Sequence, residues 1–293
     1  LQGYAKLYNA TLADYIENNV VFPSTMVDRI VPATTQEDKQ FTRSVMALDD
    51  AWPVMTEPFT QWAIEDRFTA GRPRFEDAGA EMVADVKPFE QMKLRMLNGS
   101  HSTLAYLGYL SGYEYVSQAI ANPHFHALIH GLMTDEVMPT LPMDVGSLAT
   151  YRDALIERFA NRALKHRTWQ IAMDGSQKLP QRLLGTITDR LQNGLNVNRA
   201  TLGVAAWMRY VTGIDERGKE IDVQDPLADL FHQLAVYAKE QPFKLVDGFL
   251  AVKEIFGSDL PRHEGFRSLL QAHVQSLYEV GALRTVQRVA GVG

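Results

Sequence analysis

Three polar side chains of different chemistry lie close together in an otherwise apolar stretch. The segment MKLRMLNGSHSTLAYLGYLSGY, residues 92–113, carries Lys93, Asn98 and His101. A desolvated lysine amine can be pushed towards its neutral form and accept a proton, while an amide and an imidazole can donate hydrogen bonds to an oxygen atom. Together the three groups could hold a carbonyl or alkoxide oxygen, which is the chemistry of alcohol oxidation.

A helix can bring these groups to one side. On an α-helix Lys93, Asn98 and His101 lie at about 0°, 140° and 80° around the axis, over a rise of roughly 12 Å. Asn98 and His101 are neighbours on such a surface, and the helix-weakening pair Asn98-Gly99 predicts a distortion that would alter these angles. A structural interpretation stays open, because helical Lys is usually solvated, Asn-Gly often marks a turn, and a single His is commonly a satisfied core residue.

Two other clusters contain ionisable side chains. HFHALIH brings together His124, His126 and His130, but their spacing does not face one helical side and no Glu completes a zinc-protease pattern, so we expect no metal there. The segment RALKHRTWQIAMDGSQKLPQR gathers the basic residues Arg162, Lys165, His166, Arg167, Lys178 and Arg182. These residues form either a solvated basic patch or an anion pocket for a carboxylate.

Composition excludes several classes of protein. The chain has 293 residues, 46% of them hydrophobic and 22% charged, as in a soluble globular protein with a substantial core. A net charge of −6 without long runs of like charge argues against nucleic acid as a partner. The absence of Cys excludes disulfides, thiolate zinc sites and a cysteine nucleophile. The apolar runs are too short to span a bilayer and no secretory signal is recognisable, so we expect a cytoplasmic protein.

The pattern of apolar residues changes along the chain. It predicts a helix at the start, a strand near VVFPSTMVDRIVP, a helix capped by Thr35 and Asp38, and two or three strands within residues 50–86. From Pro88 onward, apolar spacing of three and four residues predicts an all-α region of about eight to ten helices. No G-x-G-x-x-G, Walker-type or G-x-S-x-G motif occurs in the chain.

Four segments resemble one family. VVFPSTMVDRIVP (residues 20–32) resembles the signature of the polyol-specific long-chain dehydrogenases, the family of mannitol 2-dehydrogenase, fructuronate reductase and tagaturonate reductase. KLRMLNGSHSTLAYLGYLSGYE (93–114) is similar to the active-site helix of that family, with its K-x4-N-x2-H spacing intact. HRTWQIAMDGSQKLPQRLL (166–184) and GVAAWMRYVTGIDERGKEIDVQDPLA (203–228) resemble its fructuronate reductase (D-mannonate oxidoreductase) branch. The resemblance extends over essentially the whole chain.

The resemblance implies a mainly α fold. Residues 1–86 would be the distal portion of a Rossmann-like dinucleotide-binding domain, a mixed α/β tail without the glycine-rich part. Residues 87–293 would be an all-helical substrate and catalytic domain of the 6-phosphogluconate dehydrogenase C-terminal type. The chain would then be the C-terminal part of an enzyme, and we expect that alone it neither binds NAD tightly nor turns over.

The resemblance also implies roles for residues. Lys93 would be the general base, and Asn98 and His101 would polarise the substrate oxygen during hydride transfer to or from NAD without a metal. Asp28 would lie near substrate or cofactor, although it could also be a strand-end residue paired with Arg29 or capping a backbone group. The counter-charge for a sugar-acid carboxylate would come from Lys178 or Arg182, with Arg167 behind them. Residues that bind the cofactor stay unassigned.

The implied reaction interconverts D-mannonate and D-fructuronate. The partners would be a small sugar acid or polyol and a nicotinamide cofactor, with no nucleic acid and no membrane, and the oligomeric state is open. Two alternatives remain. The first is a mannitol or other polyol 2-dehydrogenase acting on uncharged substrates. The second is a non-catalytic helical binding module whose polar trio is buried for packing.

Overall fold

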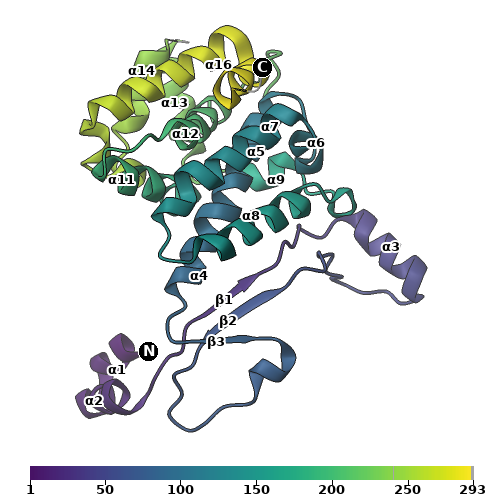
Figure 1. The fold of residues 1–293 in the computed structure, drawn as a ribbon, viewed down its shortest axis with the longest axis vertical. Coiled ribbons are helices and arrows are strands. Elements are labelled where there is room, and N and C mark those ends of the chain that lie inside the picture. The colour runs from purple at the N-terminus through teal and green to yellow at the C-terminus, as the bar shows by residue number, and fades with distance from the viewer. Residues whose placement is uncertain (240, 292–293) are drawn as a thin grey trace. The chain divides into compact units, whose positions relative to one another are not determined.

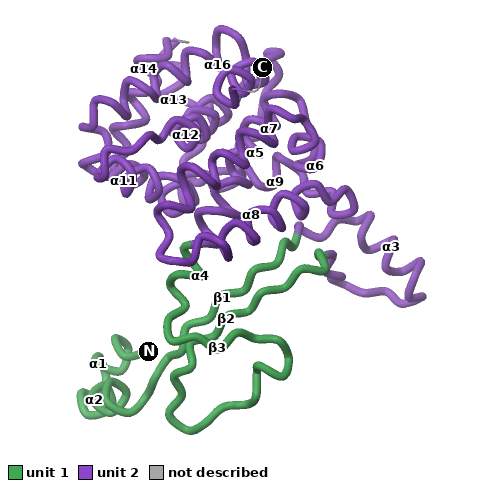
Figure 2. The backbone as a smooth tube through the Cα atoms, in the orientation of Figure 1, with its two compact units in different colours: residues 1–31, 56–91 green, residues 32–55, 92–293 purple. Residues whose placement is uncertain are grey.

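The chain forms two compact units in the computed structural model, which describes residues 1–239 and 241–291. Unit 1 comprises residues 1–31 and 56–91, and unit 2 comprises residues 32–55 and 92–293 (Figure 2). The described part of the chain is mainly α-helical with one small sheet, which confirms the mainly α fold that was expected. The residue segment 32–55 therefore leaves unit 1 and packs as part of the helical unit.

Unit 1 is built around a three-stranded sheet. Strand β1 (Thr25–Asp28) pairs antiparallel with β2 (Gln61–Glu65), and β2 pairs parallel with β3 (Glu81–Val83), with the short 3₁₀ helix η1 (Phe75–Ala78) before β3. Met26, Ala63 and Val86 form an apolar cluster at the sheet, and Ala5, Ala13 and Ile16 of the first residues form another. The expected strands are present, but β1 begins after Pro23 and not in the β-branched run before it, because Pro has no N–H to give to a ladder.

The predicted first helix is two helices. Helix α1 (Gln2–Tyr8) ends at Asn9, whose φ of −158° is extended, and α2 (Ala10–Asn19) begins immediately after it. The Asn9 side chain accepts a hydrogen bond from the Leu12 backbone N–H at 3.1 Å. The break occurs because Asn is a strong N-cap that starts a new helix. The apolar spacing did not reveal it, because that spacing continues across Asn9.

Residues 32–55 contain helix α3 (Gln36–Met46), and its predicted cap is confirmed. The Asp38 N–H donates to Thr35 Oγ1 at 3.2 Å, and the Thr35 N–H donates to Asp38 Oδ2 at 2.7 Å. Two of the four orphan N–H donors at the start of the helix are thereby satisfied. This capping box was readable from Thr35 and Asp38 alone.

Apart from connecting loops such as residues 211–227, the described residues from Lys87 onward are mainly helical, with more elements than the eight to ten expected. Short π and 3₁₀ segments divide what the apolar pattern joined. The α-helices are α4 (Lys87–Met92), α5 (Gly99–Leu110), α6 (Val116–Ile120), α7 (Pro123–Gly131), α8 (Val145–Phe159), α9 (Thr168–Ala172), α10 (Gly175–Leu179), α11 (Gly185–Gln192), α12 (Asn198–Tyr210), α13 (Ala228–Ala238), α14 (Pro242–Leu250), α15 (Lys253–Phe256) and α16 (Glu264–Ala290). The π segments are η2 (Lys93–Asn98), η3 (Leu132–Val137) and η6 (Pro180–Leu184), and the 3₁₀ segments are η4 (Met138–Thr140), η5 (Arg162–Leu164) and η7 (Leu260–Arg262).

Helices α5 and α12 form the centre of unit 2. Helix α12 packs against α5 and α16, and α5 also packs against α9 (Figure 1). Every residue of α5 except Tyr109 is buried. Trp207 of α12 lies edge-on to Phe231 and Phe249, with ring centroids 5.2 Å apart in both pairs. The polar residues of α5 therefore lie inside the unit and need partners there. Within the described ranges, no helix has the length and apolar character needed to cross a membrane.

Candidate active site

A π-helical turn carries the first two residues of the predicted trio. Segment η2 runs from Lys93 to Asn98, and the Gly99 N–H donates to the carbonyl of Leu94, five residues earlier. In such a turn residues five apart lie one above the other, whereas a straight α-helix would separate Lys93 and Asn98 by about 140°. The distortion expected at Asn98-Gly99 is therefore present as a π turn, which reduces the angle between Lys93 and Asn98 from that of a straight α-helix. Both side chains are partly exposed.

His101 lies on the next turn, in the first part of α5, and is buried. Its ring stacks on Phe159 at 5.1 Å and 25°, and meets the ring of His166 edge-on at 4.8 Å and 81°. Burial holds the pKa of His101 well below its usual range, and the neighbouring His166, Arg182, Arg158 and Lys178 act in the same direction. His101 is therefore a neutral imidazole at pH 7, able to donate a hydrogen bond from one ring nitrogen.

Two cations of the basic segment lie near this imidazole. Lys178 belongs to α10, and Arg182 belongs to η6, which packs against η2. The Arg182 guanidinium donates from Nη1 to Ser102 Oγ at 3.0 Å, and Lys178 Nζ donates to the Met173 carbonyl at 2.6 Å. Burial lowers the pKa of both groups, and Arg182 lowers the pKa of Lys178 further, although Asp174 at 3.6 Å opposes this effect.

Two buried nitrogen atoms of this basic cluster lack a hydrogen-bond partner among the described residues. Arg182 Nε and His166 Nδ1 are buried and make no hydrogen bond within the described part of the chain. A buried donor without a partner costs roughly 1–3 kcal/mol, more when the group is charged. An anion between Lys178 and Arg182 would relieve both the missing hydrogen bond and the mutual repulsion, which is the property of a carboxylate pocket.

Asp225 fixes the helix that carries Lys178. Its carboxylate accepts hydrogen bonds from the Ser176 N–H at 2.8 Å, from Ser176 Oγ at 2.6 Å and from the Leu227 N–H at 2.9 Å. Asp225 and Ser102 were not predicted as site residues, and His166 was named only as one of the six basic residues of a possible anion pocket. Contacts such as Ser102 with Arg182 join positions 80 residues apart in the sequence, so local spacing gave no signal for them.

The other two predicted site residues are Arg167 in unit 2 and Asp28 in unit 1. Arg167 is exposed, pairs with Glu114 at 3.7 Å, and lines a cavity of about 420 Å³ together with Thr35, Phe41 and Lys165. Asp28 is the last residue of β1 in unit 1, is fully buried and lies opposite Gln61 in the sheet. Its neighbour Arg29 donates from Nε to the Glu57 carbonyl at 3.0 Å.

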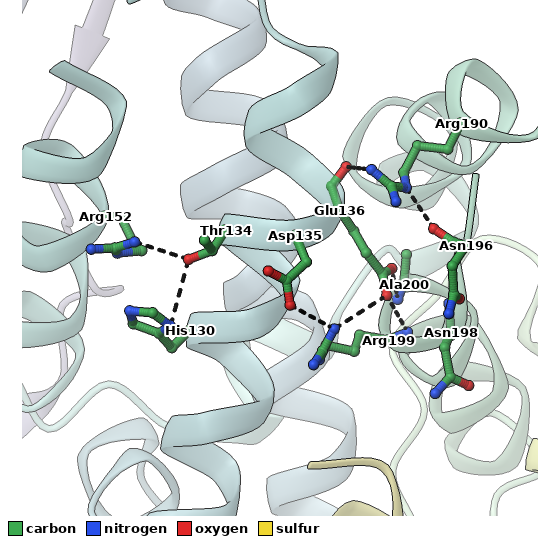
Figure 3. Close-up of polar contacts among 10 residues, drawn as sticks. All are labelled: His130, Thr134, Asp135, Glu136, Arg152, Arg190, Asn196, Asn198, Arg199 and Ala200. Carbon is green, nitrogen blue, oxygen red and sulfur yellow. Dashed lines mark hydrogen bonds and ion pairs between the residues drawn. The ribbon is translucent and has the colours of Figure 1, made fainter. Parts of the chain in front are cut away.

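A second polar network supports the centre of the unit. Glu136 of η3 is 2% exposed and accepts hydrogen bonds from the N–H groups of Arg199 at 2.8 Å and Ala200 at 2.9 Å, at the start of α12 (Figure 3). Burial raises the pKa of Glu136, and these two donors oppose the change. Arg190 donates to the Glu136 carbonyl at 3.3 Å. The network anchors α12 and has the character of a helix cap.

The histidines of HFHALIH form no ligand set. His126 and His130 have nearly parallel rings 6.3 Å apart, and His130 lies within 3.5 Å of the Thr134 hydroxyl (Figure 3). Across residues 1–239 and 241–291, no three His, Cys, Asp or Glu side chains converge in a way that could hold a metal ion. The candidate site is therefore described by its amine, amide, imidazole and guanidinium groups.

Two family models match the chain. Residues 85–278 match the mannitol dehydrogenase C-terminal domain, and residues 4–77 match the mannitol dehydrogenase Rossmann domain. Together these matches cover most of the chain.

Individual proteins extend the comparison. D-mannonate oxidoreductase of Escherichia coli K12 is 50% identical over 285 residues, covering 97% of this chain and 58% of that protein. Mannitol 2-dehydrogenase of Phaeosphaeria nodorum is 40% identical over 294 residues, covering 99% and 50%. The structure of Pseudomonas fluorescens mannitol 2-dehydrogenase in ternary complex with NAD and D-mannitol superposes with a TM-score of 0.90 at 36% identity, covering 100% of this chain and 59% of that one. The chain thus spans between half and three fifths of these relatives.

Proposed function

Because the chain belongs to the mannitol dehydrogenase family, we propose that it is the C-terminal portion of an NAD-dependent oxidoreductase that interconverts D-mannonate and D-fructuronate. The observation that carries the choice of substrate is the desolvated pair Lys178 and Arg182 beside His101. The 50% identity to a D-mannonate oxidoreductase supports the same choice.

The proposed chemistry uses the three groups predicted from the sequence. Lys93 takes the proton of the substrate hydroxyl, while Asn98 and neutral His101 donate hydrogen bonds to the oxygen as it gains negative charge. Each such donor contributes about 3 kcal/mol to stabilisation of the developing alkoxide. NAD supplies, when bound, the nicotinamide carbon that accepts the hydride from the same substrate carbon. No metal is needed, because amide and imidazole donors replace a Lewis acid at the oxygen.

In this proposal the carboxylate end of the substrate binds to Lys178 and Arg182. The sugar-acid carboxylate lies between Lys178 and Arg182, where the unpartnered Arg182 Nε gains an acceptor. Asp28 is assigned a place near substrate or cofactor, and Arg167 a supporting role for the carboxylate; both assignments rest on the family resemblance. The helical domain is assigned to the 6-phosphogluconate dehydrogenase C-terminal type on the same ground.

The residues of this chain do not fit the phosphate part of NAD. No glycine-rich phosphate-binding turn of the G-x-G-x-x-G type occurs in the sequence. The relatives are considerably longer than this chain. We assign the phosphate site to the part of the full-length protein outside this chain, and expect that the 293 residues alone neither bind NAD tightly nor turn over. A cytoplasmic location remains our expectation.

A neutral polyol is the second candidate substrate. The structural relative with a TM-score of 0.90 contains D-mannitol, so the same fold accepts an uncharged polyol there. Measurement of kcat/KM with D-mannonate and D-mannitol on the full-length protein separates the two candidates. We expect a strong preference for D-mannonate with NAD, and a preference for D-mannitol would make the second candidate correct.

Lys178→Met tests the carboxylate assignment. Loss of one charge-assisted hydrogen bond costs about 1.5–3 kcal/mol, so we expect the KM for D-mannonate to rise about 10- to 100-fold, and turnover of a neutral polyol to change much less. The control is Lys165→Met, a neighbouring cation with a 69% exposed side chain that pairs with Glu37. Equal losses for acid and polyol would show that Lys178 does not bind the carboxylate.

A further inference from the structure

The two π turns of the candidate site touch through their backbones. Gly99 directly follows η2, and a Cβ atom at this position would lie 2.7 Å from the carbonyl oxygen of Arg182 and 3.5 Å from Leu183 Cδ2. Such a short contact with backbone cannot be relieved by a side-chain rotation. Glycine is therefore the residue that permits η6 to approach the end of η2 this closely.

A side-chain contact lies one turn further along the same helix. Ser102 is 1% exposed, and its Oγ accepts the hydrogen bond from Arg182 Nη1 at 3.0 Å. Ser102 follows His101 directly, so the helix that presents His101 also holds the guanidinium. This bond occupies one edge of the Arg182 guanidinium and leaves the buried Nε without a partner.

We propose that Gly99 and Ser102 are positioning residues that set the distance between the substrate's reacting oxygen and its carboxylate. The inference rests on the proposed function, since it takes Asn98 and His101 as the oxygen site and Arg182 as part of the carboxylate site. Both contacts join η6 to the element that carries Asn98 and His101, so the separation of the two ends is built into the packing.

This arrangement selects substrates by the distance between their carboxylate and their reacting hydroxyl. Because Arg182 is fixed by a backbone contact and a buried hydrogen bond, it cannot follow a carboxylate that lies nearer to or farther from the oxidised carbon. The ligand class is therefore a sugar acid with a fixed number of carbons between its carboxylate and its reacting hydroxyl. A sugar acid one carbon shorter satisfies one end of the site and leaves the other unpaired, which costs affinity.

The test is a double-mutant cycle in the full-length protein, with D-mannonate as substrate. Ser102→Ala removes the hydrogen bond with almost no change in volume, and Arg182→Met removes its partner. We expect Ser102→Ala to raise the KM for D-mannonate about tenfold with a small change in kcat, and to have almost no further effect in the Arg182→Met background. A purely structural role for Ser102 would give additive effects, and additivity would overturn the inference.

Gly99→Ala provides the second arm, with Gly185→Ala as its matched control. Gly185 follows η6 as Gly99 follows η2, but a Cβ there would meet nothing closer than Arg95 Nη2 at 3.5 Å. We expect Gly99→Ala to lower kcat/KM for D-mannonate at least tenfold. We also expect it to reduce the ratio of kcat/KM for D-mannonate to that for a sugar acid one carbon shorter, whereas Gly185→Ala should change neither value. If Gly99→Ala fails to fold, the double-mutant cycle of Ser102 and Arg182 tests the inference alone.

Two outcomes distinguish the inference from the proposed function. Full-length protein without D-mannonate activity would refute the proposed function and this inference together. An active protein with additive effects in the Ser102 and Arg182 cycle would refute the inference alone.

Discussion

His101 shows how one residue gains its chemistry from its surroundings. The imidazole lies between Phe159 and His166 in a helix buried on almost every side, so its charged form is disfavoured. Nearby Lys178 and Arg182 disfavour that charge further. In the proposed mechanism, neutral His101 donates a hydrogen bond to the developing alkoxide, whereas the positive charges of Lys178 and Arg182 pair with the carboxylate. Burial and charge would thus separate hydrogen-bond donation to the oxygen from binding of the carboxylate within one site.

The neighbouring histidine gives a prediction about pH. Burial lowers the pKa of His166 to about 4, below the roughly 6.5 of an unfolded His. The unfolded chain therefore binds a proton that the native protein does not bind between about pH 6.5 and 4, so the free energy of unfolding falls as the pH is lowered through this range. We expect His166→Gln to reduce the loss of stability between pH 7 and pH 5 by about 1–2 kcal/mol.

Urea denaturation at both pH values measures this difference. His126→Gln is the control, since His126 is exposed on α7. The same pH dependence in wild type and His166→Gln would show that His166 is not desolvated in the native protein.

At the scale of elements, the π turn η2 changes the relative directions of the side chains along the helix that carries Lys93 and Asn98. The K-x4-N-x2-H spacing in Lys93, Asn98 and His101 was visible in the sequence, and Asn98-Gly99 predicted a distortion. The direction of the distortion was not predictable, because a helical wheel assumes 100° per residue and η2 does not obey it. The Thr35–Asp38 cap was predicted because capping is local, whereas the break at Asn9 was missed because apolar spacing continues across it.

The third π turn offers a test of element stability. Glu136 of η3 accepts two backbone hydrogen bonds at the start of α12 and is buried. Its replacement in Glu136→Ala leaves both N–H groups without a partner, and we expect the free energy of unfolding to fall by about 2–4 kcal/mol. The adjacent Asp135→Ala is the control, because Asp135 is 57% exposed and its ion pair with Arg199 contributes under about 1 kcal/mol. Circular dichroism during urea titration measures both, and equal losses would contradict the capping role.

At the scale of the molecule, the two compact units and the two family matches divide the chain differently, because residues 32–55 belong to unit 2 but lie within the Rossmann match at residues 4–77. The division of the chain into a cofactor part and a substrate part at residue 86 remains a prediction. Motifs 20–32 and 93–114 sufficed to recognise the family, since each is long and the two follow in the right order. The pairing of Arg182 with Ser102, and the edge-on contact of His166 with His101, could not be read from the sequence because folding alone brings those positions together.

The most direct test of the account is the kcat of the full-length protein carrying Lys93→Ala, measured with NAD and D-mannonate. General-base catalysis contributes about 10²- to 10⁴-fold, so we predict a loss of kcat of this size with an unchanged free energy of unfolding. A kcat within about tenfold of wild type, or a loss of stability in place of a loss of rate, would show that Lys93 is a packing residue and would contradict the proposed catalytic site.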